Sequence, residues 1–168
     1  MWLYVVRHGI AEERAPSGLD RDRRLTAAGR ERMRRAARGL GRLGVEVDVL
    51  LTSPLPRASE TAEVLAAALP GVPTPRVFDA LATGFGSVEL LRQLRPLAGT
   101  ERLMVVGHEP TLSGLIALLL TGSVSGAAVT MKKGAVALLE LERLAPRGEA
   151  FLRWLLPPGV LRRLARGQ

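Results

Sequence analysis

The sequence predicts an α/β three-layer sandwich, in which a mixed, mostly parallel sheet has helices on both faces. Two observations predict it. Short apolar runs alternate with amphipathic helical stretches along most of the chain, as parallel strand–helix–strand units require. Near the end, two further apolar runs (135–141 and 150–155) follow each other across Pro146-Arg147-Gly148, which predicts an antiparallel hairpin. The length of 168 residues fits a single domain over 1–168.

The first half of the chain predicts two strands, each followed by a helix. Apolar runs rich in β-formers indicate buried strands, and apolar residues at helical spacing indicate helices with one buried face. Thr26 is placed to cap the first helix, Gly44 to end it, and Pro70-Gly71 to end the second. The expected elements are a strand over 2–6, a helix over 26–43, a strand over 45–51 and a helix over 58–69.

The second half predicts one more strong strand, with a helix on either side of it. Ser87 is a candidate cap for the earlier helix, Pro110 suits the first turn of the later one, and Gly122 follows its end. The expected elements are a short strand over 76–78, a loop over 82–86, a helix over 87–95, a strand over 103–106, a helix over 110–121, the hairpin, and a short helix over 160–165.

Composition excludes several kinds of chemistry. With no cysteine, the chain cannot form disulfides, thiolate metal sites or a cysteine nucleophile. Its two histidines, His8 and His108, cannot by themselves complete a histidine-rich metal site. No apolar run approaches the roughly 20 residues needed to span a bilayer, so we expect a soluble, cytoplasmic protein without a membrane partner.

The charge balance is strongly basic and dominated by arginine. The net charge is +8, and Lys132 and Lys133 are the only lysines among 24 basic residues. The guanidinium group suits phosphate and carboxylate bidentately, so a phosphorylated partner is one interpretation. A compositional bias acting on solvated surface positions is the simpler explanation for most of these arginines.

Polar motifs follow each of the three strongest predicted strands. Arg7-His8-Gly9 follows the first, Arg57 stands close after the second, and Gly107-His108-Glu109-Pro110 follows the third. Ligands of open α/β sheets bind beyond the carboxyl ends of the strands. If the three strands are neighbours, Arg7, His8, Arg57 and His108 converge on one pocket.

The chemistry that these four side chains favour is phosphoryl transfer. A neutral imidazole is a competent nucleophile near pH 7, and two guanidinium groups can hold the phosphoryl oxygens. A protonated second histidine would add a donor and positive charge, and nearby helix N-termini would add N–H groups. No metal or other cofactor is required. Each residue alone also has a purely structural interpretation, although Arg57 in a first helical turn is unfavourable unless an anion neutralises it.

Four motifs in order resemble those of the histidine phosphatase superfamily, also called phosphoglycerate mutase-like. They are Leu3-Tyr4-Val5-Val6-Arg7-His8-Gly9, Arg24-Leu25-Thr26-Ala27-Ala28-Gly29, Thr52-Ser53-Pro54-Leu55-Pro56-Arg57-Ala58-Ser59-Glu60-Thr61-Ala62 and Val105-Val106-Gly107-His108-Glu109. The resemblance covers about residues 1–142. The short segment between the second-strand and third-strand motifs is similar to the SixA-type phosphohistidine phosphatase branch.

The resemblance implies a role for each matched residue. His8 would be phosphorylated transiently, while Arg7, Arg57 and His108 would form the phosphate pocket, and water would then release phosphate. Gly9 belongs to the same motif and is a candidate binding residue. In SixA-type relatives an acidic and a basic residue near the site precede the Leu-Thr pair, and Asp20 and Arg23 fall at the matching places. Ordinary loop charges are the alternative for these two.

The sequence departs from the family pattern at the general acid. Many members have a glutamate there, upstream of a Phe-Gly pair, and here the comparable position is Thr83. Threonine is no proton donor of suitable pKa, whereas an imidazole leaving group, with a pKa of about 6.5, needs little acid help. The departure favours phosphohistidine over alkyl phosphates. Glu109 or Asp20 could substitute as the acid.

Three functional hypotheses remain from the sequence. We expect a phosphatase for phosphohistidine in a protein; the alternative enzyme acts on small phosphorylated metabolites, with mutase activity less favoured because no sizeable insertion encloses an intermediate. The third is a nucleic-acid or acidic-protein binding module built on the 30–42 helix. Six aromatic residues provide few stacking platforms, and Glu31 stands at ion-pair spacing from Arg34 and Arg35. We therefore expect a monomer without a nucleic-acid partner.

Overall fold

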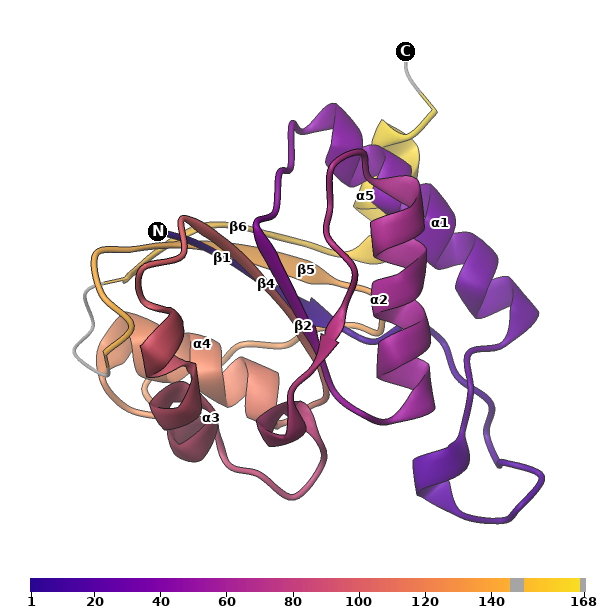
Figure 1. The fold of residues 1–168 in the computed structure, drawn as a ribbon, viewed down its shortest axis with the longest axis horizontal. Helices are drawn as coiled ribbons and strands as arrows, with labels where there is room; N and C mark the ends of the chain where they lie inside the picture. The colour runs from indigo at the N-terminus through magenta and orange to yellow at the C-terminus, as the bar shows by residue number, and fades with distance from the viewer. Residues whose placement is uncertain (146–149, 167–168) are drawn as a thin grey trace.

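One six-stranded sheet runs through the protein, in the strand order β3-β2-β4-β1-β5-β6 (Figure 1). The structure is a computed structural model that describes residues 1–145 and 150–166. The strands are β1 (Trp2–Arg7), β2 (Val49–Thr52), β3 (Arg76–Val77), β4 (Arg102–Gly107), β5 (Val136–Leu141) and β6 (Ala150–Leu156). The pairs β3–β2, β2–β4 and β4–β1 are parallel, whereas β1–β5 and β5–β6 are antiparallel. The mixed, mostly parallel sheet is confirmed.

Helices cover both faces of this sheet and complete the three layers (Figure 1). The helices are α1 (Ala27–Arg42), α2 (Pro56–Ala68), α3 (Ser87–Leu94), α4 (Thr111–Thr121) and α5 (Pro158–Leu164). Side chains of β1 alternate between the two layers, as the pleat of a strand requires. Leu3 and Val5 pack in the apolar cluster with α3 and α4, whereas Tyr4 and Val6 pack in the cluster with α1, α2 and α5. Most residues of β1, β2 and β4 are buried on both faces of the sheet, which explains why these three strands are continuous apolar runs.

Local signals in the sequence begin and end the helices largely as expected. The Thr26 hydroxyl accepts a hydrogen bond from the Gly29 N–H at 2.9 Å and caps α1. Gly44 and Gly122 lie just past α1 and α4 with φ of +69° and +82°, a conformation that glycine adopts without strain. The antiparallel hairpin of β5 and β6 is confirmed, and its predicted turn at 146–148 lies outside the described residues.

Several boundaries differ from those that the sequence predicts, and three of the differences have a clear physical basis. The second strand begins at Val49 rather than Val45, because its partner β4 begins only at Arg102 and the ladder starts at the pair Val49–Leu103. Ser87 is the first residue of α3 rather than its cap, and its hydroxyl instead donates to the Thr111 carbonyl at 2.8 Å. Pro110 precedes α4 instead of lying in its first turn.

The order of the strands decides where polar side chains meet. Because β2, β4 and β1 are adjacent and parallel, their carboxyl ends lie at one edge of the sheet, with Val6 opposite Val106 and Thr52 also opposite Val106. The chain also contains three short 3₁₀ helices among the described residues: η1 (Asp20–Asp22) before α1, η2 (Asp79–Leu81) before α3, and η3 (Arg95–Leu97) after α3. Within 1–145 and 150–166, no helix is long and apolar enough to cross a membrane.

Candidate active site

Both histidines of the protein meet at the carboxyl edge of the parallel strands. His8 follows β1 and His108 follows the adjacent β4, and their ring centroids are 5.0 Å apart. The two residues are only 6% and 4% exposed. The structure therefore brings together two buried imidazoles that stand 100 residues apart in the sequence.

The surroundings of His8 leave one ring nitrogen ready to act as a nucleophile. Its Nδ1 lies 2.7 Å from the Gly9 carbonyl oxygen, and because a carbonyl only accepts, Nδ1 carries the proton and Nε2 keeps its lone pair. Burial is the main cause that lowers the pKa of His8 to about 4; the Gly9 hydrogen bond opposes it, and the charges of Arg57, Arg7 and Lys133 add to it. His8 is thus neutral at pH 7.

His108 is also neutral, and it has an N–H to offer. Burial lowers its pKa to about 3, with the neighbouring His8 as the next contribution, so the positive second histidine considered from sequence is absent in the unliganded protein. Its Nε2 lies 2.9 Å from Ser53 Oγ, which already accepts from the Leu55 N–H. Because a hydroxyl oxygen can accept two hydrogen bonds, the tautomer is an assignment: we place the Ser53 proton toward Nε2 and the imidazole proton on Nδ1, which is buried without a partner among the described residues.

Arg57 supplies a buried cation from the first turn of α2. The residue is 4% exposed, and its guanidinium donates to the backbone carbonyl of Asp20 at 2.8 Å and to the Asp20 carboxylate at 3.0 Å. Pro56 begins the helix and fixes where this side chain leaves the backbone. Asp20 thus partly neutralises a cation that the helix N-terminus would otherwise disfavour.

Arg7 supplies a second cation, held from the opposite side of the edge. One of its terminal N–H groups donates to the Met131 carbonyl at 2.6 Å, while Nε is buried with no partner among the described residues. An unpaired buried N–H costs free energy, which an anion accepting from it would recover. Arg7 and His108 therefore each leave one donor unused at this edge.

Gly9 and Thr61 connect the first strand to α2. The Gly9 N–H donates to Thr61 Oγ1 at 3.0 Å, and the Thr61 hydroxyl donates to the Arg57 carbonyl at 2.6 Å. A Cβ at Gly9 would lie 2.7 Å from Cγ of Met33, so a larger residue would displace the α1 side chain beneath it. This chain of contacts keeps the segment after His8 in register with the turn that carries Arg57.

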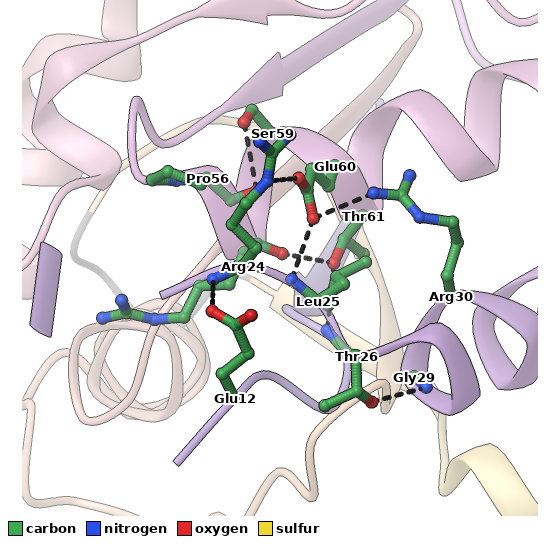
Figure 2. A network of polar contacts seen from close by, with 12 residues as sticks. Glu12, Arg24, Leu25, Thr26, Gly29, Arg30, Pro56, Ser59, Glu60 and Thr61 are labelled. Carbon is green, nitrogen blue, oxygen red and sulfur yellow. Dashed lines mark hydrogen bonds and ion pairs between the residues drawn. The ribbon is translucent and has the colours of Figure 1, made fainter. Parts of the chain in front are cut away.

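Glu60, in α2, anchors the segment before α1 to α2 (Figure 2). Its carboxylate is 3% exposed and accepts from Arg24 Nε at 2.6 Å, from the Leu25 N–H at 2.8 Å and from Arg30 at 3.0 Å. A buried carboxylate with three donors is a well-satisfied anchor. Because Asp20 belongs to the segment anchored in this way, Glu60 helps to hold Asp20 against Arg57.

The remaining candidate residues lie at different places. Asp20 contacts Arg57, and Arg23 donates to the Asp20 carboxylate at 2.7 Å and to the Glu12 carbonyl at 2.5 Å. The hydrogen bond from Arg23 lowers the pKa of Asp20, with a further contribution from the Arg57 charge, so this carboxylate is ionised at neutral pH. Glu109 accepts from the Ser113 hydroxyl at 2.5 Å, and its other oxygen is buried without a partner among the described residues. Thr83 is exposed.

Sequence reasoning did not single out four residues that hold this arrangement. Ser53, Glu60 and Thr61 all stand in the motif around Arg57, so the motif itself was the signal that could have found them. Met131 carries no such signal, because only its backbone carbonyl takes part. In the described ranges, no group of three or more histidine, cysteine, aspartate or glutamate residues could hold a metal ion.

A three-layer α/β fold that brings two histidines and two arginines to the carboxyl edge is an arrangement suited to an enzyme that binds a phosphoryl group. A family model described as histidine phosphatase superfamily (branch 1) matches residues 3–89, and an uncharacterized protein of Picosynechococcus sp. is 38% identical over 94% of this chain and 100% of its own length. The chain belongs to the histidine phosphatase superfamily, which confirms the family resemblance seen in the sequence motifs.

Solved structures agree with this family assignment and include SixA-type phosphatases among the most similar folds. The protein histidine phosphatase SixA complexed with tungstate superposes with a TM-score of 0.83 at 26% identity, covering 96% of this chain and 99% of that one. A candidate SixA from Agrobacterium tumefaciens gives 0.78 at 21% identity, with 94% and 97% covered. The alpha-ribazole phosphatase from Shigella flexneri gives 0.69 at 18% identity, with 94% and 97% covered, and shows the same fold. The expected resemblance to SixA-type phosphatases is confirmed.

Proposed function

We propose that this protein hydrolyses phosphohistidine in a protein substrate, through a phosphoryl group carried transiently on His8 and without a metal ion. Family membership and the likeness to SixA support a phosphatase. One observation supports the choice of substrate: the carboxylate that contacts the site, Asp20, is ionised by Arg23 and Arg57. A site without a ready proton donor suits a leaving group that needs none.

In the first step, the Nε2 lone pair of His8 attacks phosphorus and the P–N bond of the substrate breaks. When the substrate ring is protonated at its other nitrogen, the bonding electron pair goes to a neutral imidazole, so the enzyme donates no proton. The Nδ1–H of His8 remains hydrogen-bonded to the Gly9 carbonyl oxygen, and this hydrogen bond orients the ring during the transfer.

In the second step, water attacks the phosphoryl group on His8 and loses a proton to solvent, and the electron pair of the P–N bond returns to Nε2. Arg7 Nε and His108 Nδ1 are the two unpartnered donors for phosphoryl oxygens. The Arg57 guanidinium offsets the negative charge once the substrate competes with Asp20 for it. Both steps use the same three groups, because the phosphoryl group stays between them.

Trapping the phosphoenzyme tests this proposal. The wild-type protein, quenched during turnover of phosphohistidine, should carry an acid-labile, base-stable phosphoryl adduct on His8. His8→Ala should lose the adduct and at least about 10³-fold in turnover. If His8→Ala still accumulates the adduct and turns over, the mechanism is wrong.

A phosphatase for small phosphorylated metabolites is the second candidate, and the fold shared with alpha-ribazole phosphatase favours it. The comparison of kcat/KM on a phosphohistidine peptide and on alkyl phosphates separates the two. We expect the peptide to be preferred, because an alkoxide leaving group needs a proton that the ionised Asp20 does not provide. A preference for an alkyl phosphate would contradict the phosphohistidine proposal in favour of a small-metabolite phosphatase. It would also point to Glu109 as the general acid.

A further inference from the structure

A basic groove opens beside the candidate active site. It has a volume of about 410 Å³ and is lined in part by Arg7 and Gly9, the residues on either side of His8 in the sequence. Five basic side chains line it and no acidic residue does. They are Arg7, Arg32, Lys132, Lys133 and Arg162.

The two lysines are placed here by the backbone that closes the active-site edge. The Gly134 N–H donates to the carbonyls of Arg7 and His8, at 3.1 and 2.9 Å, and the Arg7 N–H donates to the Ala135 carbonyl at 3.1 Å. Gly134 has a φ of +80°, which lets the chain turn directly after Lys133. The positive charge of Lys133 contributes to the lowered pKa of His8, which shows that this lysine is electrostatically close to the nucleophile. The only two lysines of the chain thus stand beside the candidate nucleophile.

Arg162 and Arg32 form the other walls of the groove. Arg162 comes from α5, which sits very close to α1: a Cβ at Gly39 of α1 would lie 2.0 Å from the Leu161 carbonyl oxygen. Arg32 comes from α1, and Figure 1 shows α5 lying against that helix. Positive charge therefore reaches one groove from four segments: β1, α1, the residues just before β5, and α5.

These basic side chains lack the partners that other arginines of α1 have. Arg34 and Arg35 pair with Glu31, and Arg30 pairs with Glu60. None of the five basic residues of the groove forms an ion pair with a carboxylate in residues 1–145 and 150–166. The groove is therefore a concentration of positive charge whose compensation has to come from solvent ions or from a bound partner.

We propose that this groove binds a carboxylate-rich segment of the phosphorylated protein while the phosphohistidine occupies the site at His8. This inference rests on the proposed function and adds a preference for substrates with acidic residues near the phosphohistidine. Arg32, Lys132 and Lys133 are exposed, and the charge is spread over four segments of the chain, as suits several carboxylates along a peptide. A second phosphate group of a small metabolite would instead be held best by donors that converge on one point, and these basic side chains are spread along the groove.

Two phosphohistidine peptides of equal length test the proposal, one flanked by Asp and Glu and the other by Asn and Gln. At about 0.02 M salt the wild-type protein should favour the acidic peptide roughly 10-fold in kcat/KM, and at about 0.5 M salt the preference should disappear. Lys132→Glu/Arg162→Glu should abolish or invert the preference at low salt. Arg38→Glu/Arg163→Glu, at exposed positions of α1 and α5 outside the groove, changes the net charge equally and should keep the preference.

Binding of the unphosphorylated, fluorescently labelled peptides keeps the test independent of catalysis. The acidic peptide should bind the wild type and the Arg38→Glu/Arg163→Glu protein more tightly than the neutral one, but not the Lys132→Glu/Arg162→Glu protein. If neither phosphopeptide is hydrolysed while this binding difference is seen, the proposed function fails and the groove proposal stands. Equal kcat/KM and equal binding of both peptides by the wild type would overturn the groove proposal alone, as would an equal loss in the two double variants.

Discussion

The two ends of the central parallel strands differ in how their arginine side chains are paired with carboxylates. At the amino end, Arg102 at the start of β4 donates to both oxygens of Asp48, at 3.0 and 2.6 Å, and also pairs with Glu46. At the carboxyl end of the same strands, Arg7 has no carboxylate partner in the described residues, and Arg57 shares Asp20 with Arg23. The amino end is a solvent-exposed ion-pair cluster, and the carboxyl end is a buried site with unused donors.

This difference shows which charges contribute to stability and which await a ligand. Exposed pairs such as Arg102–Asp48 contribute little, because solvent screens them. The buried arginines and neutral histidines at the other end lower stability a little, since their donors are unpaired and their positive charges are close together. Proteins tolerate such an arrangement at functional sites.

Removing one arginine from each end is the strongest way to break the comparison. Arg57→Ala should lower kcat/KM on phosphohistidine by on the order of 10²-fold or more, because a guanidinium that offsets transition-state charge is lost. Arg102→Ala should leave kcat/KM within about 2-fold and cost no more than about 1 kcal/mol of unfolding free energy. Steady-state kinetics and denaturant titration check the two outcomes, and similar kinetics for both variants would contradict the functional contrast.

As the pH falls, the protein should lose stability first through the histidines at the carboxyl end of the strands, and only at lower pH through the ion pairs at the amino end. The folded-state pKa values of His8 and His108 are about 4 and about 3, below the unfolded value of 6.5, so the unfolded chain binds more protons between these limits. Their contribution to stability is complete above pH 6.5 and is lost as the pH falls toward 4. For His8 alone, we expect a loss of about 2 kcal/mol between pH 6.5 and 4.5.

Denaturant unfolding at a series of pH values measures this loss. His8→Asn should remove the part due to His8, so that the variant's unfolding free energy changes less over that pH range than the wild type's. The contribution of Asp48 is lost only at lower pH, because the hydrogen bond from Arg102 holds the pKa of Asp48 below 3.8 in the folded state, and the contribution is present above that value. A wild-type stability that is flat between pH 6.5 and 4.5 would show that the two rings are not protected from protonation.

Two glycines of α1 give a smaller and finer test of how the carboxyl end is supported. Gly39→Ala would bring a methyl group within 2.0 Å of the Leu161 carbonyl, so α5 must shift, with an expected cost of about 1–3 kcal/mol. Gly41→Ala meets only a Leu69 methyl group at 3.6 Å and should stabilise the protein by about 0.5–1 kcal/mol. Thermal or denaturant unfolding compares them, and equal effects would mean that α5 is not tightly seated.

The sequence predicted the strands of the site well because each is a clear apolar run with a polar motif at its end. Their parallel order then brought His8 and His108 together without further information. The resemblance implied only that Asp20 lies near the site, and its contact with Arg57 was not predicted, since no periodicity relates an irregular segment to a helix 37 residues away. The start of β2 was predicted four residues early, because the burial of Val45 and Val47 comes from the cluster with α1 and α2 and not from a ladder.

The sequence pattern also gave no sign that Met131, Lys132 and Lys133 approach His8. They precede β5, and an antiparallel strand places its beginning, not its end, at the carboxyl edge of β1. A rule based on residues after strands therefore overlooks them. Only the register of β5 against β1, with Val136 opposite Val6, brings that segment to the site.

The position of β1 in the centre of the sheet also has a consequence for folding. Trp2 pairs with Arg102 on one side and with Glu140 on the other, and the N-terminal ammonium group donates to the Leu141 carbonyl at 2.8 Å. The strand that presents His8 can complete its pairing only after segments more than a hundred residues later have been synthesised. Contacts this distant in sequence slow folding. The nucleophile strand is thus among the first parts of this chain to be made and among the last to reach its final neighbours, so truncated chains ending before β5 would contain every motif residue and still lack an assembled site.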